Sequence, residues 1–323
     1  MPLPSYLAVG QWNDTSGRFF NLEDRLAGQD RPLTLPRPIY MPEYSVVNTT
    51  VMGHFAISEA YIRERFLELF RTCRPHGDDE FLFVDSGSNE GSWSLLAAAH
   101  GCKVVAIDPQ PLCIELLRVA ATRSGFDNID MYNHILAPHH VNVSLNVPSD
   151  QCHGTSQYVT HLRKVSDVTL PGRSHLARRR SAPRHAVSAK SLDELVGPRR
   201  TVSLWHLDVE GAEVPVLRSA RRLFAERRIR RVVLEFIPAR WPAHNLTRTG
   251  PLPELARLFA GWQCHVICPF GGANHHKQPV STSVIKPRTT CRALHPLCSP
   301  IQRSSPSCVW TVRVHFGDGE GSH

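Results

Sequence analysis

Three aspartates, each at the end of an apolar run, are the residues whose types and spacing point most directly to chemistry. The first is Asp85, which ends the run that begins at Phe81 and is followed by a glycine turn and then by a second apolar stretch. This order is typical of a buried parallel strand that leads into the N-terminus of a helix, where α/β proteins hold nucleotide-like ligands. A carboxylate at that place repels a diphosphate and attracts a cation.

The spacing of the glycines distinguishes between two classes of ligand. A dinucleotide fingerprint has the order G-x-G-x-x-G, whereas Gly87 and Gly91 are spaced G-x-x-x-G. Together with Asp85, this spacing disfavours a nicotinamide dinucleotide and favours a ligand that carries an ammonium and a sulfonium group. S-adenosylmethionine is such a ligand.

A second strand repeats the pattern from Lys103 to Asp108, about 20 residues further on, the spacing at which a carboxylate can hold ribose hydroxyls. Pro111 then suits the first turn of the next helix. An ordinary doubly wound domain with chance acids at two strand ends is the alternative, but the two motifs occur together and in register.

The chain resembles the FkbM family of S-adenosylmethionine-dependent methyltransferases from about residue 81 to about residue 270. Three motifs carry the resemblance: Asp85-x-Gly87-x-Asn89-x-Gly91, Asp108-Pro-Gln-Pro and Leu207-Asp208-Val-Glu210-Gly-Ala-Glu213. The third motif, placed after a strand, is the most specific. The resemblance implies an enzyme that methylates hydroxyl oxygens, typically on sugars or polyketides.

The predicted cofactor site follows from these motifs. We expect the cofactor to be bound by Asp85, Gly87, Asn89, Gly91, Asp108 and Asn133. Asn133 ends the third predicted strand, where the resemblance implies contact with the adenine, although an ordinary surface turn explains this residue about as well.

The predicted base lies at the end of the fourth strand. Methyl transfer to a hydroxyl needs a nucleophile held in line with the methyl–sulfur bond and a group that removes its proton. Asp208, His206 and Glu213 are the catalytic candidates, since His206 and Asp208 are two residues apart and share one side of the strand. Glu213 has a structural alternative, as a first-turn acid of the following helix. A purely structural role is harder to assign to Asp208, because a carboxylate at the end of a buried strand costs folding free energy unless it has a partner.

The acids also raise the question of a metal. Asp208, Glu210 and Glu213 could bind Mg²⁺, so magnesium stays open without being required. An iron site built on His206 needs a distal histidine and usually a jelly-roll barrel, which the strand–helix alternation contradicts. The cysteines from 264 to 308 contain no C-x-x-C pair and are unevenly spaced, which disfavours a structural zinc site. The predicted site therefore contains no assigned metal.

The predicted fold is α/β, a doubly wound, seven-stranded, mostly parallel Rossmann-like sheet with a last antiparallel strand. An amphipathic helix over 57–71, capped by Ser58, precedes it, and a helix over 112–124 ends at Gly125. A short helix at 191–195, a single helix over 214–222 with Pro215 in its first turn, and strands at 231–236, 263–268 and 309–316 complete it.

The predicted chain consists of an N-terminal extension and one domain that carries two insertions. Residues 1–56 form an N-terminal extension, read as a loosely packed arm rather than a lid, and 57–323 form the methyltransferase domain. That domain carries a basic disordered insertion at about 148–190 and an irregular one at about 269–308. The basic insertion has no acid from 171 to 189 and no interleaved aromatics, so we expect a solvated loop or a clamp for an acidic substrate, and no specific nucleic acid.

The composition bounds the remaining choices. A chain of 323 residues with 41% hydrophobic and 20% charged residues can bury a core, and its net charge of +8 suits an acidic partner without identifying one. Nine scattered cysteines predict reduced thiols. No signal peptide or membrane-spanning run is expected, so the localisation stays unknown, with the cytoplasm as default. The sequons at Asn13, Asn48, Asn142 and Asn245 keep a Golgi lumen open, should an anchor be missing from this sequence.

The sequence therefore predicts an S-adenosylmethionine-dependent O-methyltransferase acting on a small-molecule or glycan acceptor. The alternative from another class is a non-catalytic protein that keeps the fold and binds an acidic glycan or RNA. The intact acids and glycines of the predicted cofactor site argue against this alternative. The acceptor and the oligomeric state are not given by these residues.

Overall fold

The computed structural model describes residues 18–28, 33–43, 60–73, 80–140, 142–145, 152, 185–237, 240–242, 246–247, 250–259, 263–267 and 308–313. The chain divides into two compact units: unit one comprises residues 1–135 and 139–190, and unit two comprises residues 136–138 and 191–323. No helix within these described ranges is both long and apolar enough to cross a membrane.

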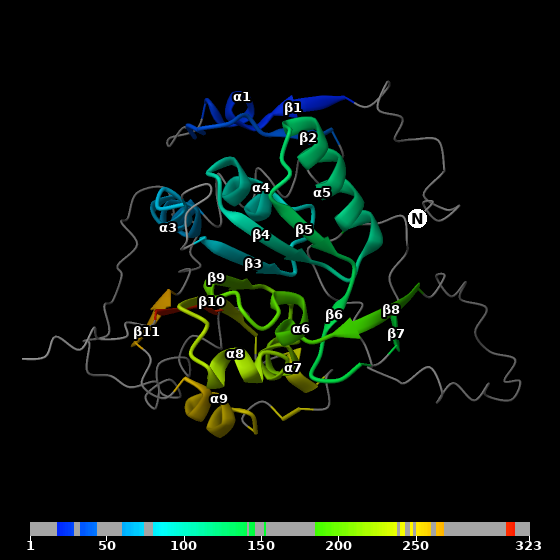
Figure 1. Ribbon diagram of the computed structural model, residues 1–323, viewed down its shortest axis with the longest axis vertical. Helices are drawn as coiled ribbons and strands as arrows, with labels where there is room; N and C mark the ends of the chain where they lie inside the picture. The colour runs from blue at the N-terminus through cyan, green and yellow to red at the C-terminus, as the bar shows by residue number, and fades with distance from the viewer. Residues whose placement is uncertain are drawn as a thin grey trace, which may run out of the picture. The chain divides into compact units, whose positions relative to one another are not determined.

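Three parallel strands form the centre of unit one: β3 (Leu82–Ser86), β4 (Lys103–Ile107) and β5 (Ile129–Tyr132). β4 lies between the other two, with Leu82 opposite Lys103 and Val104 opposite Ile129 (Figure 1). Every residue of β3 is buried, as expected for an apolar strand inside a parallel sheet. Because the strands are parallel, their carboxyl ends meet at one edge.

Two helices connect these strands. α4 (Ser92–Ala99) contacts β3 and β4 and is buried along its whole length, which explains its nearly unbroken apolar sequence. α5 (Pro111–Ser124) contacts β5 and begins with a proline in its first turn. It ends at Gly125, whose φ of 68° is left-handed, so both predicted ends of this helix are confirmed.

The predicted amphipathic helix before the first strand is α3 (Ala60–Phe70). Ile62, Phe66 and Phe70 are buried, and the ring of Phe66 meets those of Phe83 and Trp93 edge-on, with centroids 5.7 and 4.9 Å apart. The apolar side chains of α3 therefore pack in the hydrophobic core, as predicted. The predicted cap at residue 58 lies outside the described residues.

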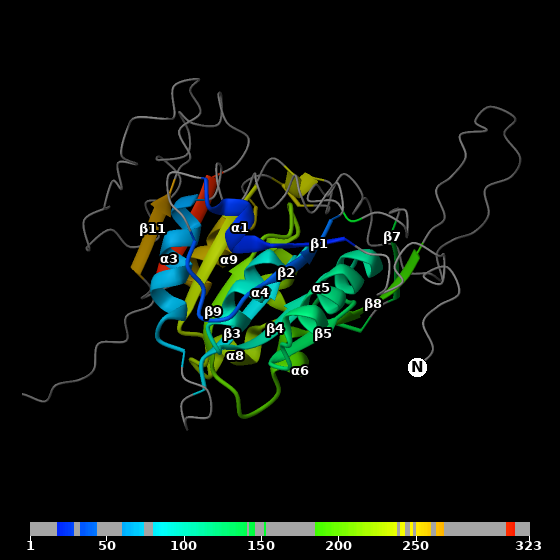
Figure 2. The same cartoon turned by 90° about the horizontal axis from the view of Figure 1, so that it is seen from above.

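The N-terminal segment packs more tightly than predicted. β1 (Phe19–Asn21) pairs antiparallel with β2 (Tyr40–Pro42), and α1 (Leu22–Leu26) follows β1 directly. The backbone N–H of Tyr40 donates to Ser124 Oγ of α5 at 2.9 Å, and Figure 2 shows β2 beside that helix. Leu22, Ile39 and Met41 are fully buried. The prediction of a loosely packed arm is therefore wrong for the described part. The sequence of this segment shows no helical or strand periodicity, but its apolar side chains are buried in the folded unit.

Two paired strands lie at the borders of the basic insertion, β7 before it and β8 at its end. β6 (Ile135–Leu136) follows β5, and β7 (Asn142–Leu145) pairs antiparallel with β8 (His185–Lys190). Val187 and Ala189 are buried, so the predicted disordered boundary at residue 190 is wrong and 185–190 belong to the folded chain. Residues 153–184 lie outside the described part.

Four of the nine cysteines form disulfides in unit one, Cys73 with Cys102 and Cys113 with Cys152. The prediction of reduced thiols is wrong for these four. The partners are 29 and 39 residues apart in sequence, so neither spacing forms a local motif, and only the fold brings their Cα atoms within 5.0 Å.

Unit two contains parallel strands β9 (Val202–Leu207) and β10 (Arg231–Phe236). β12 (Cys308–Arg313) pairs antiparallel with β10 and with β11 (Gln263–Ile267). The mostly parallel α/β class is therefore confirmed, whereas a single seven-stranded sheet stays a prediction.

The helices of unit two are short: α6 (Leu192–Val196), α7 (Glu213–Arg218), α8 (Arg221–Ala225) and α9 (Leu252–Leu258). α6 has the capping box of Ser191 and Glu194. The single helix predicted over 214–222 is wrong. The carboxylate of Asp193 accepts the backbone N–H groups of Arg222 and Leu223, at 2.8 and 2.9 Å, and thereby starts a separate helix.

Candidate functional site

The glycine turn after β3 is left-handed at three positions. Gly87, Asn89 and Gly91 have φ values of 79°, 50° and 90°, which bend the chain sharply between strand and helix. A Cβ at Gly91 would lie 2.3 Å from Cδ1 of Leu117 on α5, so glycine is also required by close packing. Gly91 thus serves the approach of two helices, a role beyond cofactor binding alone.

Asp85 is fully buried at the end of β3. Its Oδ2 accepts a hydrogen bond from the hydroxyl of Ser94, at 2.6 Å, which lies in the first turn of α4. The carboxylate therefore fastens the helix start to the strand end. Sequence reasoning missed Ser94, although a hydroxyl inside an otherwise apolar helix was the available signal.

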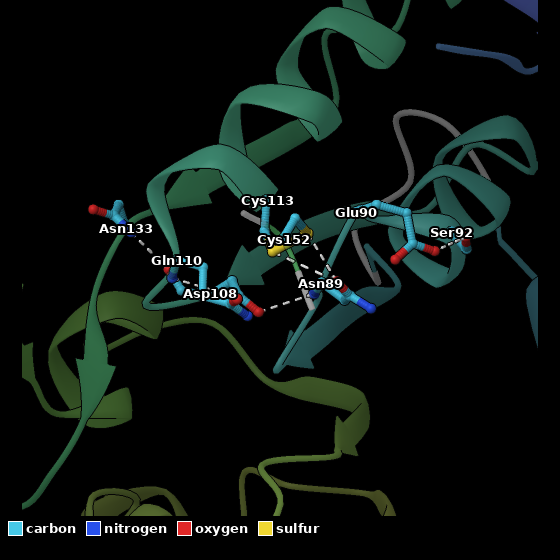
Figure 3. Close-up of a disulfide and its surroundings, with 8 residues drawn as sticks. All are labelled: Asn89, Glu90, Ser92, Asp108, Gln110, Cys113, Asn133 and Cys152. Atoms are coloured by element: carbon cyan, nitrogen blue, oxygen red, sulfur yellow. Dashed lines mark hydrogen bonds between the residues drawn. A yellow bond between two sulfur atoms is a disulfide. The ribbon is translucent and has the colours of Figure 1, made fainter. Parts of the chain in front are cut away.

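Asp108 is the centre of the site (Figure 3). Its Oδ2 accepts the backbone N–H of Asn89 at 3.0 Å, and its Oδ1 accepts the backbone N–H of Gln110 at 2.7 Å. Burial raises the pKa of Asp108 to about 7, against the opposing effect of these two N–H groups, and the nearby charge of Asp85 adds to the rise. The carboxylate thus joins the loops that follow β3 and β4.

Asn133 lies at the end of β5 and belongs to the same group. Its Nδ2 donates to the backbone carbonyl of Asp108 at 3.0 Å, and the backbone N–H of Asp108 donates to the carbonyl of Tyr132. The predicted residues of β3, β4 and β5 are therefore brought together by direct hydrogen bonds. Contact between Asn133 and an adenine ring stays a prediction.

The donor set fits S-adenosylmethionine better than a dinucleotide. Two carboxylates, Asp85 and Asp108, lie at the carboxyl ends of adjacent strands, and carboxylates accept hydrogen bonds from ribose hydroxyls and attract an ammonium group. The same charges would oppose a diphosphate at the start of α4. This chemistry agrees with the order of the glycines.

The acidic turn of unit two follows β9. Asp208 is half-buried, and Glu210, in a left-handed conformation with φ 53°, pairs with the guanidinium of Arg240. His206 lies within β9 and is 5% exposed. Of the three predicted catalytic residues, Asp208 is therefore the most exposed as a whole residue, although its Oδ1 atom is buried.

Glu213 is fully buried at the start of α7. Its Oε1 accepts the backbone N–H of Gly211 at 2.7 Å, and its Oε2 accepts the indole N–H of Trp241 at 2.8 Å. Burial raises the pKa of Glu213 to about 7; the two donors oppose this rise, and the charge of Asp208 adds to it. Both carboxylate oxygens therefore stabilise the turn between β9 and α7. The sequence analysis gave a structural role for Glu213 only as the alternative to catalysis.

The three acids of this turn do not gather as metal ligands. Glu210 faces Arg240 and Glu213 accepts from Gly211 and Trp241, while no group of three potential metal-ligating side chains occurs in the ranges that the structure describes. The arrangement gives no support to the magnesium alternative. Asp208 and its neighbours belong to unit two, whereas the six predicted cofactor residues belong to unit one.

Acids at the ends of adjacent parallel strands, joined by a glycine turn to a buried helix, define a doubly wound α/β protein with a site for a nucleoside cofactor. The chain matches the methyltransferase FkbM domain over residues 85–249. It belongs to the FkbM family of S-adenosylmethionine-dependent methyltransferases. No curated protein matches the chain.

Solved structures with a similar arrangement include three bacterial proteins. An rRNA methylase from Streptococcus thermophilus is 12% identical, covers 78% of this chain and 95% of its own, and has a TM-score of 0.39. A precorrin-6y C5,15-methyltransferase from Geobacter metallireducens is 11% identical over 80% and 90% of the two chains, with a TM-score of 0.37. A putative methyltransferase from Streptococcus mutans in complex with SAH is 8% identical over 79% and 97%, with a TM-score of 0.37.

Proposed function

We propose that this protein is an O-methyltransferase that transfers the methyl group of S-adenosylmethionine to a hydroxyl of a sugar, a glycan or a small hydroxylated metabolite. The observation that carries the proposal is the carboxylate of Asp108, which is held by two backbone N–H groups at the common edge of β3 and β4. A carboxylate fixed in this way is suited to accept both hydroxyls of a ribose.

The chain's own residues would bind and orient the reactants. Asp108 would hold the ribose, Asp85 would provide negative charge for the amino-acid part of the cofactor, and Asn133 would lie beside the adenine. When bound, the cofactor supplies a methyl group that is already activated by its sulfonium. What remains for the protein is to position the acceptor hydroxyl and to remove its proton.

Asp208 is our candidate for that base. It directly follows β9 in the family's most specific motif and is half-buried, whereas Glu213 is fully buried with both oxygens engaged and His206 is 5% exposed. A general base must reach the proton that it removes, so the greater exposure of Asp208 favours it; since its Oδ1 is buried, Oδ2 is the oxygen that would accept the proton. We assign Glu213 to positioning of the turn and leave His206 a secondary candidate.

We also propose that the chain folds in an oxidising compartment such as the Golgi lumen. Two disulfides in unit one support this, because disulfides persist in secretory compartments and are rare in the cytosol. The four sequons fit the same compartment. Endoglycosidase treatment of protein expressed in a eukaryotic cell, read as a shift in mass, tests this part.

The activity is tested by incubating the purified chain with methyl-labelled S-adenosylmethionine and a panel of sugars, glycolipids and small phenols, followed by mass spectrometry. We expect label on a hydroxyl oxygen of at least one acceptor. Label on nitrogen or carbon would contradict O-methylation. Tight cofactor binding with no transfer to any hydroxylated acceptor would instead favour the non-catalytic binding protein.

A further inference from the structure

A disulfide lies directly on the cofactor loop. Cys113 is the third residue of α5, and Cys152 comes from the chain beyond β7; both are fully buried. Figure 3 shows the two sulfurs facing Asn89, whose Oδ1 lies 2.9 Å from Sγ of Cys152 and 3.5 Å from Sγ of Cys113. Since both sulfurs are bonded to each other and carry no hydrogen, these are packing contacts that fix the side chain of Asn89.

The same asparagine is hydrogen-bonded to Asp108. The backbone N–H of Asn89 donates to Asp108 Oδ2, while its φ of 50° is a left-handed conformation that residues with a Cβ adopt reluctantly. Asparagine adopts this conformation more readily than other residues with a Cβ, but at a cost relative to glycine, so contacts with its surroundings help to hold it. The disulfide packs against the side chain of Asn89, and the carboxylate of Asp108 accepts a hydrogen bond from its backbone N–H.

The covalent link also fixes the start of α5. Gln110, the residue before this helix, donates its N–H to Asp108 Oδ1, and Cys113 follows three positions later. The disulfide therefore joins the helix start, the glycine loop and the segment at Cys152 around a single carboxylate. The burial that raises the pKa of Asp108 agrees with this closed arrangement.

We propose that the Cys113–Cys152 disulfide is a positioning element of the cofactor site, which holds Asn89 against Asp108 and on which the affinity for S-adenosylmethionine depends. The proposal rests on the proposed function of this site. Its physical basis is preorganisation: a loop that is already ordered loses less conformational entropy when the ligand binds.

The second disulfide provides a matched control. Cys73–Cys102 lies in the same unit and has the same Cα–Cα distance of 5.0 Å, with a loop of 29 rather than 39 residues, so the two links constrain the unfolded chain to a similar degree. Cys102 precedes β4, whereas Asp108 follows the other end of that strand. The two residues are six positions apart along extended chain, a distance of about 20 Å.

The experiment measures the dissociation constant for S-adenosylhomocysteine by calorimetry, and the melting temperature, for three proteins: wild type, Cys113→Ala with Cys152→Ala, and Cys73→Ala with Cys102→Ala. We expect both variants to melt at lower temperature. Only the first should bind S-adenosylhomocysteine more weakly, by about tenfold, while the control stays within about twofold of wild type. Wild-type affinity in the first variant, or equal weakening in both, would overturn the proposal.

A double-mutant cycle tests the route through Asn89. Asn89→Gly keeps the left-handed turn but removes the side chain that the sulfurs contact. In that background, loss of the Cys113–Cys152 link should change the affinity by less than about twofold, because the two changes remove the same interaction. An undiminished tenfold loss in the Asn89→Gly background would show that the disulfide does not act through this residue, and would overturn the proposed route.

If the first variant fails to fold, the variant Cys73→Ala with Cys102→Ala is titrated with a dithiol instead. Reduction breaks the S–S bond, gives Cys113 and Cys152 as two thiols, and oxidises the dithiol to its cyclic disulfide. Binding of S-adenosylhomocysteine should weaken as reduction proceeds and recover on reoxidation; unchanged binding after complete reduction would overturn the proposal. Failure of the oxidised wild type to bind S-adenosylhomocysteine would instead refute the proposed function itself, and this proposal with it.

Discussion

The buried carboxylate of Glu213 gives a prediction that can be worked out in free energy. Its pKa is raised from an ordinary value of 4.5 to about 7 in the folded protein. The folded state therefore binds more protons than the unfolded state between these two values, and the free energy of unfolding falls as the pH rises through this window. One pH unit of such a difference is worth about 1.36 kcal/mol, so the ionised carboxylate costs the folded protein about 3 kcal/mol above pH 7.

The test substitution is Glu213→Gln, which keeps the shape of the side chain and removes the titrating group. Its amide oxygen can accept one of the two N–H groups that Glu213 accepts, and its NH2 group cannot accept the other. At pH 4.5 the variant should be less stable than the wild type by the cost of this lost hydrogen bond, and that cost does not change with pH. From pH 4.5 to pH 8 the wild type should lose about 3 kcal/mol relative to the variant. Because Asp108 is the same in both proteins, its own raised pKa cancels in the difference.

The assay is urea denaturation followed by tryptophan fluorescence, with the disulfides kept oxidised, at several pH values from 4.5 to 8.5. Glu254→Gln is the control of opposite sign, because its hydrogen bond with Arg218 lowers the pKa of Glu254. That pairing stabilises the fold above the unfolded pKa of Glu254 and is lost as the pH falls, so its variant should be relatively less stable at high pH. A difference between wild type and Glu213→Gln that does not change with pH would refute the reasoning.

Three further predictions address single residues. Asp208→Asn should lower kcat by about 10²-fold or more while leaving S-adenosylhomocysteine binding within about a few-fold, and near wild-type turnover without metal would make Asp208 structural. Gly91→Ala should lower the free energy of unfolding by about 3 kcal/mol, seen as a lower melting temperature, because its Cβ meets Leu117 and its φ is left-handed. Trp241→Phe should cost about 2 kcal/mol at pH 8 and raise the pKa of Glu213 further, measured as an upward move of the stability midpoint in pH titrations.

The sequence alone determined the elements that carry the cofactor site. The strands ending at Asp85 and Asp108, the glycine turn, and the helix from Pro111 to Gly125 were all predictable. Each of them depends on a local signal: an unbroken apolar run, a residue type that a left-handed turn or a first turn requires, or the spacing between two strand ends. The family motifs added the acidic turn after β9 in the same way.

The tertiary structure decided which groups these residues meet. Asp193 breaks a predicted helix by binding N–H groups about 30 positions away, and Trp241 reaches Glu213 from 28 positions away. Both disulfides join cysteines that no sequence spacing relates. Local signals report the conformation that the backbone adopts, because propensity and capping act within a few residues of one another. A hydrogen bond or disulfide between distant segments forms only when packing of the apolar faces has brought the two segments together. Which residues become partners is therefore determined by the tertiary structure.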